Sequence, residues 1–165
     1  MSFAANIIWS ENPIDKVEEF LNARNYAHER RSSNEVVVEV QGKWSNLLVF
    51  FSFENNIRCL HISCLMNMEA KIENKSKIFE LLALVNDNLW LGHFSYWPER
   101  KMPVFRHSVL CNEQNLLFEK QIAQIFEIAV KECERLYPVF NVVLNKGMEP
   151  AQALYPFLME TLGQA

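Results

Sequence analysis

Glycine is scarce in this chain, with four among 165 residues, and these are spread over positions 42, 92, 147 and 163. Phosphate-binding loops and dinucleotide-binding turns need several glycines close together, because the backbone must approach the ligand without an intervening side chain. The chain also has no HExxH pair of histidines and no GxSxG turn around a nucleophilic serine. We therefore predict no catalytic residue, no cofactor and no metal.

The chain also lacks an excess of positive charge and any long apolar run. The chain has 16 Lys and Arg residues against 20 Asp and Glu residues, and a formal net charge of −4. Nucleic-acid binding needs a basic surface, and a transmembrane helix needs roughly 18 consecutive apolar residues. The N-terminus lacks the basic start and apolar stretch of a secretory signal. We expect a cytoplasmic protein that binds neither nucleic acid nor a membrane. One basic cluster is interpreted as solvated loop charge: Arg24, His28, Arg30 and Arg31.

What the chain does have is the material for a core, since 50% of its residues are hydrophobic. At this length we expect one domain over residues 1–165. The first part predicts a helix over 13–23, with Asn12 as its N-cap. Three strands should follow, joined by turns so short that neighbours must be antiparallel: 35–40, 44–54 and 57–66.

A second helix is predicted over 75–91, with Gly92 supplying a positive φ at its end. Later segments predict two more strands and then helices: strands over 93–97 and 103–111, and helices over 115–137 and from residue 150. Pro138 should kink or restart the third helix. Strands that come in runs predict an α+β fold, with an antiparallel sheet of about five strands and flanking helices.

An aromatic cluster follows the second predicted helix. Large aromatic and arginine side chains often anchor protein interfaces. We therefore predict four protein-contact residues here: Trp90, Phe94, Trp97 and Arg106. The alternative is that these aromatics fill a core corner where the helix turns into a strand.

A second cluster joins cysteine to histidine. Cys59 and His61 share one face of a predicted strand, and His107 and Cys111 share a face of a later strand. If the strands were neighbours, these side chains could form a zinc site or a Cys–His nucleophile pair. Their spacing matches no common structural zinc motif, so we interpret the cysteines as reduced and buried.

The stretch from Glu80 to His107 resembles the YbjN family of bacterial proteins in the order and spacing of several residues: Asn86, Leu89, Gly92, Phe94, Trp97, Pro98, Phe105 and Arg106. Segments 132–138 and 159–163 are similar to the alphaproteobacterial branch of that family. The resemblance implies a fold like that of type III secretion chaperones and a regulatory role in sensory transduction, linked to stress and motility. It supplies no catalytic residue. Dimers are common among chaperones of this fold, so a homodimer is one expectation.

These observations favour a non-enzymatic regulatory or chaperone-like module that binds a protein partner. One alternative is a client chaperone that holds unfolded segments. Another is a small metal- or cysteine-dependent enzyme built on one set of residues: Cys59, His61, His107 and Cys111.

Overall fold

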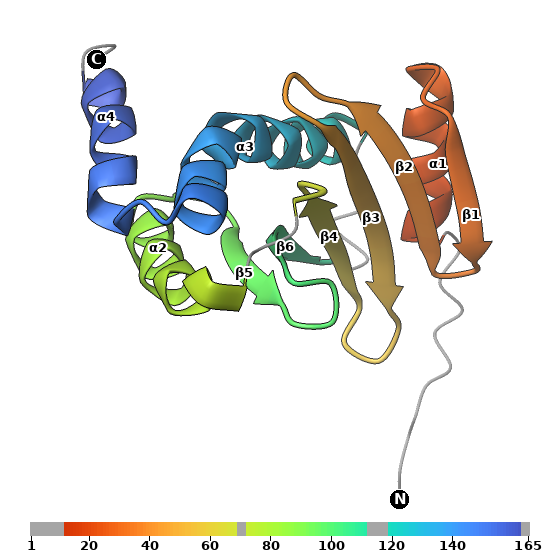
Figure 1. The fold of residues 1–165 in the computed structure, drawn as a ribbon. Coiled ribbons are helices and arrows are strands. Elements are labelled where there is room, and N and C mark those ends of the chain that lie inside the picture. Colours follow the sequence, from red (N-terminus) through yellow and green to blue (C-terminus); the bar gives the residue numbers. More distant parts are fainter. Residues whose placement is uncertain (1–11, 69–71, 112–118, 163–165) are drawn as a thin grey trace, which may run out of the picture.

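The computed structural model describes residues 12–68, 72–111 and 119–162 (Figure 1). Six strands form one antiparallel sheet in the order β1-β2-β3-β4-β6-β5. They are β1 (His28–Ser32), β2 (Glu35–Gln41), β3 (Asn46–Glu54), β4 (Cys59–Leu65), β5 (His93–Trp97) and β6 (Met102–Leu110). The helices are α1 (Pro13–Ala23), α2 (Lys75–Asp87), α3 (Glu119–Lys146) and α4 (Pro150–Leu162), with a 3-10 turn, η1 (Ile72–Asn74), before α2. The predicted α+β class is confirmed, and the sheet has one strand more than the five expected.

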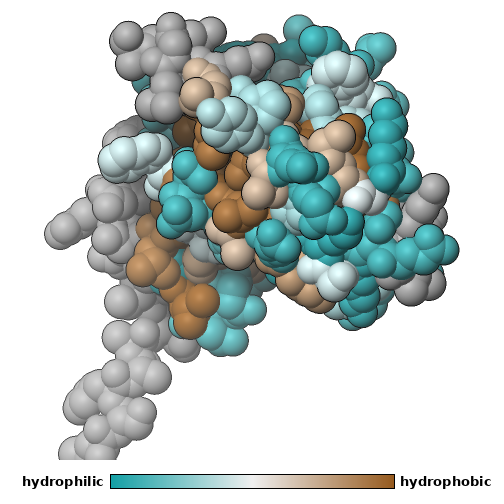
Figure 2. Space-filling model, turned by 60° about the vertical axis from the view of Figure 1, so that its left-hand side comes forward, coloured by the Kyte–Doolittle hydropathy of each residue, from teal (hydrophilic) through white to brown (hydrophobic). Residues whose placement is uncertain are grey.

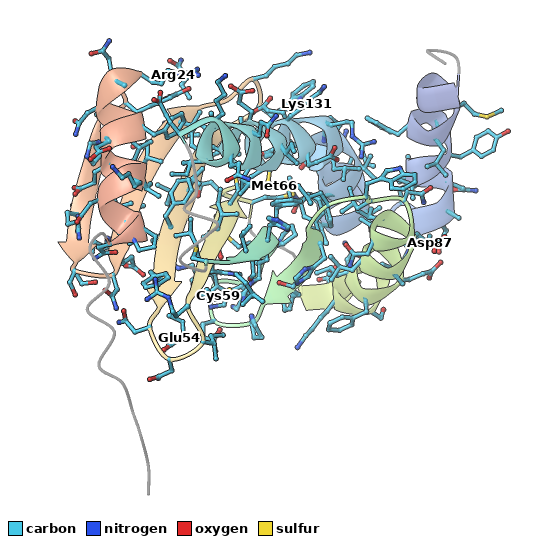
Figure 3. All side chains as sticks on the ribbon, turned by 180° about the vertical axis from the view of Figure 1, so that it is seen from behind. Arg24, Glu54, Cys59, Met66, Asp87 and Lys131 are labelled. Atoms are coloured by element: carbon cyan, nitrogen blue, oxygen red, sulfur yellow. The ribbon has the colours of Figure 1, made fainter. Side chains whose placement is uncertain are left out.

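Helices α1, α2 and α3 pack on one face of the sheet, and α4 packs against α2 and α3 at the end of the molecule (Figure 3). Alternation in β3 shows this face directly, because Leu47, Val49, Phe51 and Phe53 are buried while the residues between them are partly exposed. Large side chains from the helices complete the same core: Phe20 of α1, Leu81 of α2, Phe140 of α3 and Leu154 of α4. Figure 1 views the sheet from its other face, over which no described helix packs.

Strand β1 corrects the interpretation of the basic cluster as loop. It pairs with β2, with His28 opposite Val38. Arg30 projects toward α1, where it pairs with Asp15 at 2.8 Å and with Glu18. Charged side chains are common on edge strands because they discourage pairing with another chain.

The corner between α2 and β5 is fixed by a side chain. Asn86 donates from Nδ2 to the Phe94 carbonyl at 2.9 Å and accepts from the Phe94 N–H at 2.7 Å. The helix ends at Asp87, four residues before the predicted end at Leu91. Gly92 has the predicted positive φ, +71°, but it lies in the connection to β5, where a Cβ would come within 2.3 Å of the Phe105 ring.

Helix α3 runs through Pro138 without restarting, over 28 residues. A proline inside a helix removes one backbone hydrogen bond and costs about 3 kcal/mol. The flanking turns are buried, with Leu136, Val139 and Phe140 at most 1% exposed, and this packing outweighs that cost. The predicted start at Asn115 lies outside the described residues. Within the described ranges, no helix combines the length and apolar character needed to cross a bilayer.

Asn86→Ala should lower the free energy of unfolding by about 2 kcal/mol or more, because it leaves the N–H and C=O of Phe94 without partners. Urea unfolding followed by circular dichroism measures the change. Asn88→Ala is the matched control, since the Asn88 side chain donates to the Leu84 carbonyl of the preceding helix at an exposed position. Equal losses of unfolding free energy in the two variants would contradict the prediction that the Asn86 hydrogen bonds to Phe94 stabilise the fold.

Candidate functional site

A broad groove, called the α3 groove below, runs over the outer side of α3 and has a volume of about 1380 Å³. Three separate segments border it: the β2–β3 turn, the α2–β5 connection and α4. Its apolar lining consists of Trp44, Leu89, Trp90, Leu91, Ile128, Pro138, Phe157 and Leu158. Figure 2 turns forward the side that carries α2 and α4, where hydrophobic groups lie exposed between hydrophilic ones.

The β2–β3 turn is tied to α3 by a carboxylate. Both oxygens of Glu134 accept from the Lys43 backbone N–H at 3.0 Å. Gly42 makes this approach possible, because a Cβ there would lie 2.1 Å from a Glu134 oxygen. Trp44 then stacks parallel to Tyr137 of α3 with ring centroids 6.4 Å apart, and it remains 49% exposed. One face of this indole is therefore fixed, and the side chain still presents a large apolar area to the groove.

The α2–β5 connection contributes a second tryptophan. Trp90 is 102% exposed, so its side chain covers no other part of the protein. The connection itself is anchored at both ends, by the Asn86 bonds to Phe94 and by the close contact of Gly92 with Phe105. Trp90 lines the groove together with other apolar side chains, and a contiguous exposed apolar patch of this kind marks an interaction site.

The groove has an unbalanced positive charge. Its lining contains three basic side chains, Lys43, Lys131 and Arg135, and two acidic ones, Glu132 and Glu134. Glu132 pairs with Arg135 at 2.6 Å, and Glu134 accepts from the Lys43 backbone N–H. Lys131, which projects from α3 away from the sheet in Figure 3, has no carboxylate partner among the described residues. The Lys43 ammonium lies over the Trp44 ring, 4.8 Å from its centroid. It too has no carboxylate partner among the residues that the structure describes.

A smaller hollow of about 530 Å³ adjoins the groove and shares Leu91, Ile128 and Lys131 with it. His107 of β6 lines this hollow. Burial lowers the pKa of His107, and the charge of His93 lowers it further. The imidazole is therefore neutral at neutral pH and adds no charge to the hollow.

The four predicted protein-contact residues divide among three environments. Trp90 lines the α3 groove. The prediction that Phe94 contacts a protein partner is wrong. Phe94 is 2% exposed, and its ring centroid lies 5.2 Å from that of Phe140 and 5.4 Å from that of Phe105, so it belongs to the core. Trp97 and Arg106 meet on the helix-free face of the sheet, with the guanidinium carbon 5.9 Å from the indole centroid. The predicted cluster is thus not one surface.

The cysteine–histidine cluster does not converge. Strands β4 and β6 are neighbours, as that hypothesis required, but His61 stands opposite Ser108 whereas His107 stands opposite Ile62. Because side chains alternate, the two histidines lie on opposite faces of the sheet. No three His, Cys, Asp or Glu side chains in the described part of the chain are grouped to hold a metal ion. Burial raises the pKa of Cys111, so its thiol stays protonated.

Residues 13–141 match the YbjN family, whose description reads "Putative bacterial sensory transduction regulator". The match extends from the first residue of α1 into the second half of α3. It includes both groove tryptophans and Lys131, and it stops before α4. Comparison with curated proteins gives no match.

The protein should lose stability as the pH falls below about 6.5, the ordinary pKa of histidine. Burial is the main cause that lowers the pKa values of His61 and His107 in the folded state. The unfolded chain therefore takes up protons that the folded protein does not, and acid favours unfolding. Urea midpoints at pH 7.5 and pH 5.5 measure the loss, and His107→Asn should make it smaller. An unchanged pH dependence in this variant would contradict the assignment.

Proposed function

The chain belongs to the YbjN family, and we propose that it is a non-enzymatic regulatory module that binds a protein partner in the α3 groove. The family description, a regulator of sensory transduction, supports the regulatory part of this proposal. The observation that carries the binding part is the pair of exposed tryptophans, Trp44 and Trp90, on one apolar groove. Tryptophan is the residue type most enriched at the energetic centres of protein interfaces.

The size of the groove favours a polypeptide over a small molecule. Its volume of about 1380 Å³ exceeds the roughly 300–1,000 Å³ of typical small-molecule pockets. The lining comes from helices and loops and includes no strand edge. An extended peptide would find no backbone partners there, whereas a helix satisfies its own backbone hydrogen bonds. We therefore assign an amphipathic helix as the occupant, with its apolar face on the groove.

The charges at the groove indicate which kind of partner helix it binds. Lys43 and Lys131 stand at the groove without carboxylate partners among the described residues, while the acidic side chains Glu132 and Glu134 are engaged. A partner helix with acidic residues beside its apolar stripe would supply the missing charges. The expected partner segment is thus apolar on one face and acidic along its flank.

Trp90→Ala should leave the free energy of unfolding within about 0.5 kcal/mol of the parent value, because the side chain is fully exposed. It should weaken partner binding by roughly 2 kcal/mol or more, the loss typical of a central interface tryptophan. Photocrosslinking from position 88, which lines the same groove, identifies the partner segment in cells that express the protein, and calorimetry measures its affinity. Tyr155→Ala is the matched control, since Tyr155 is an aromatic residue of α4, 61% exposed and outside the groove lining.

The crosslinked segment should be one amphipathic helix with an acidic flank. Unfolded segments from many proteins would instead indicate the client-chaperone alternative, and crosslinks to a second copy of the chain would indicate a homodimer. Each of these outcomes contradicts the proposal, as does equal binding by the Trp90 and Tyr155 variants.

Lys131→Glu should lower the affinity for the same segment mainly by slowing association, and the difference should shrink as salt rises. Lys120→Glu makes the same charge change on an exposed side chain of α3 that does not line the groove. Surface plasmon resonance at two salt concentrations compares the two variants. If both slow association equally, the net charge of the protein rather than the groove steers the partner.

A further inference from the structure

The helix-free face of the sheet carries a compact group of hydrogen-bond donors on β4, β5 and β6. The register places Ser63 opposite Arg106, and Arg106 opposite His93. In the adjoining row, His61 stands opposite Ser108. Side chains paired in this way have Cβ atoms about 4.5–5.5 Å apart. These five side chains, called the Arg106 site below, therefore form one patch.

No acidic residue occurs in the three strands that build the Arg106 site. The nearest acidic side chain in the same rows is Glu35, two strands away from His61, and it accepts from the Ser52 hydroxyl at 3.3 Å. Arg106 forms no ion pair with any carboxylate in the described ranges. The positive charge of this patch is therefore not balanced from within these strands.

Arg106 is held in place by an aromatic ring. Its guanidinium carbon lies 5.9 Å from the centroid of Trp97, at a distance typical of cation–π contact. The Nε of Arg106 and the Oγ of Ser95 are buried, and neither has a hydrogen-bond partner within the described part of the chain. Buried donors are almost always paired in folded proteins, because an unpaired donor is costly. Because these two atoms are buried, an acceptor from outside the chain reaches Arg106 through the terminal nitrogens of its guanidinium.

His61 orients the two serines of the site. Its Nδ1 lies 2.7 Å from the Ser108 hydroxyl oxygen, and its Nε2 lies 2.9 Å from that of Ser63. Burial lowers the pKa of His61, and the charge of Arg106 lowers it further, so the ring is neutral at neutral pH. A neutral imidazole accepts a hydrogen bond from one hydroxyl and donates one to the other, which fixes both serines in a defined direction.

We propose that the Arg106 site binds the oxyanion group of a small molecule, either a phosphate or a carboxylate. Arg106 is the principal contact, because its planar fork of N–H donors matches two oxygens of such a group. Ser63 and His93 lie on either side of it and add donors. A metal cation would find no carboxylate ligand on these strands. Trp97, expected from the sequence to contact a protein, here positions the arginine.

The test is a titration of the full chain with inorganic phosphate, and separately with acetate, at pH 7 and constant ionic strength. Nuclear magnetic resonance follows the Arg106 Nε–Hε signal and the His61 ring. We expect saturable shifts at both residues with at least one anion, and the stronger of the two tells phosphate from carboxylate. Arg106→Gln should raise the dissociation constant about tenfold or more.

Arg24→Gln is the matched control, because Arg24 is an exposed arginine whose loss changes the net charge equally. Its dissociation constant should equal that of the parent. Ser63→Ala keeps Arg106 and should also weaken binding, so it decides the question if Arg106→Gln does not fold. Shifts that rise linearly without saturation, equal weakening in the Arg24 variant, or full binding by the Ser63 variant would each overturn the proposal.

Discussion

The packing of α3 against one face of the sheet is the interaction on which the other elements depend. This helix buries side chains from Ile122 to Leu144 and contacts α1, α2, α4, β4 and β6. Neighbouring turns are fastened to it by side-chain bonds, from Glu134 to the Lys43 N–H and from Asn74 to the Leu144 carbonyl. Because its inner side fills the core, its outer side becomes the floor of the groove, and the opposite sheet face carries the Arg106 site.

Much of the fold follows from local pattern. The N-cap at Asn12 forms as predicted, with its Oδ1 accepting from the Ile14 N–H at 3.0 Å. The antiparallel pairing of the three strands predicted over 35–40, 44–54 and 57–66 is also confirmed, because short turns join these neighbours. Predictions from local sequence pattern were wrong where contacts between distant segments determine the structure. Strand β1 consists largely of charged residues that suit an edge, and Pro138 is tolerated because the turns around it are buried.

The candidate site was harder to predict, because burial depends on where α2 ends. Trp90 and Phe94 are four residues apart and similar in chemistry, yet one is fully exposed and the other is 2% exposed. Helical periodicity could not place the end at Asp87, which the Asn86 bonds to β5 determine. Similarly, the sequence left open whether β4 and β6 are neighbours, and the register of that pair places His61 and His107 on opposite faces of the sheet. Trp44 joins the site only because its turn reaches α3.

Because Trp90 is fully exposed, selection for folding does not act on this side chain, and only selection for partner binding does. At most large apolar positions, drift is limited by folding, because a smaller residue leaves a cavity. Position 90 carries no such constraint, so a lineage could replace this tryptophan without repairing the core elsewhere. If relatives that have diverged elsewhere still carry tryptophan at this position, partner binding alone has conserved it. If the residue is often substituted among relatives, the partner has changed.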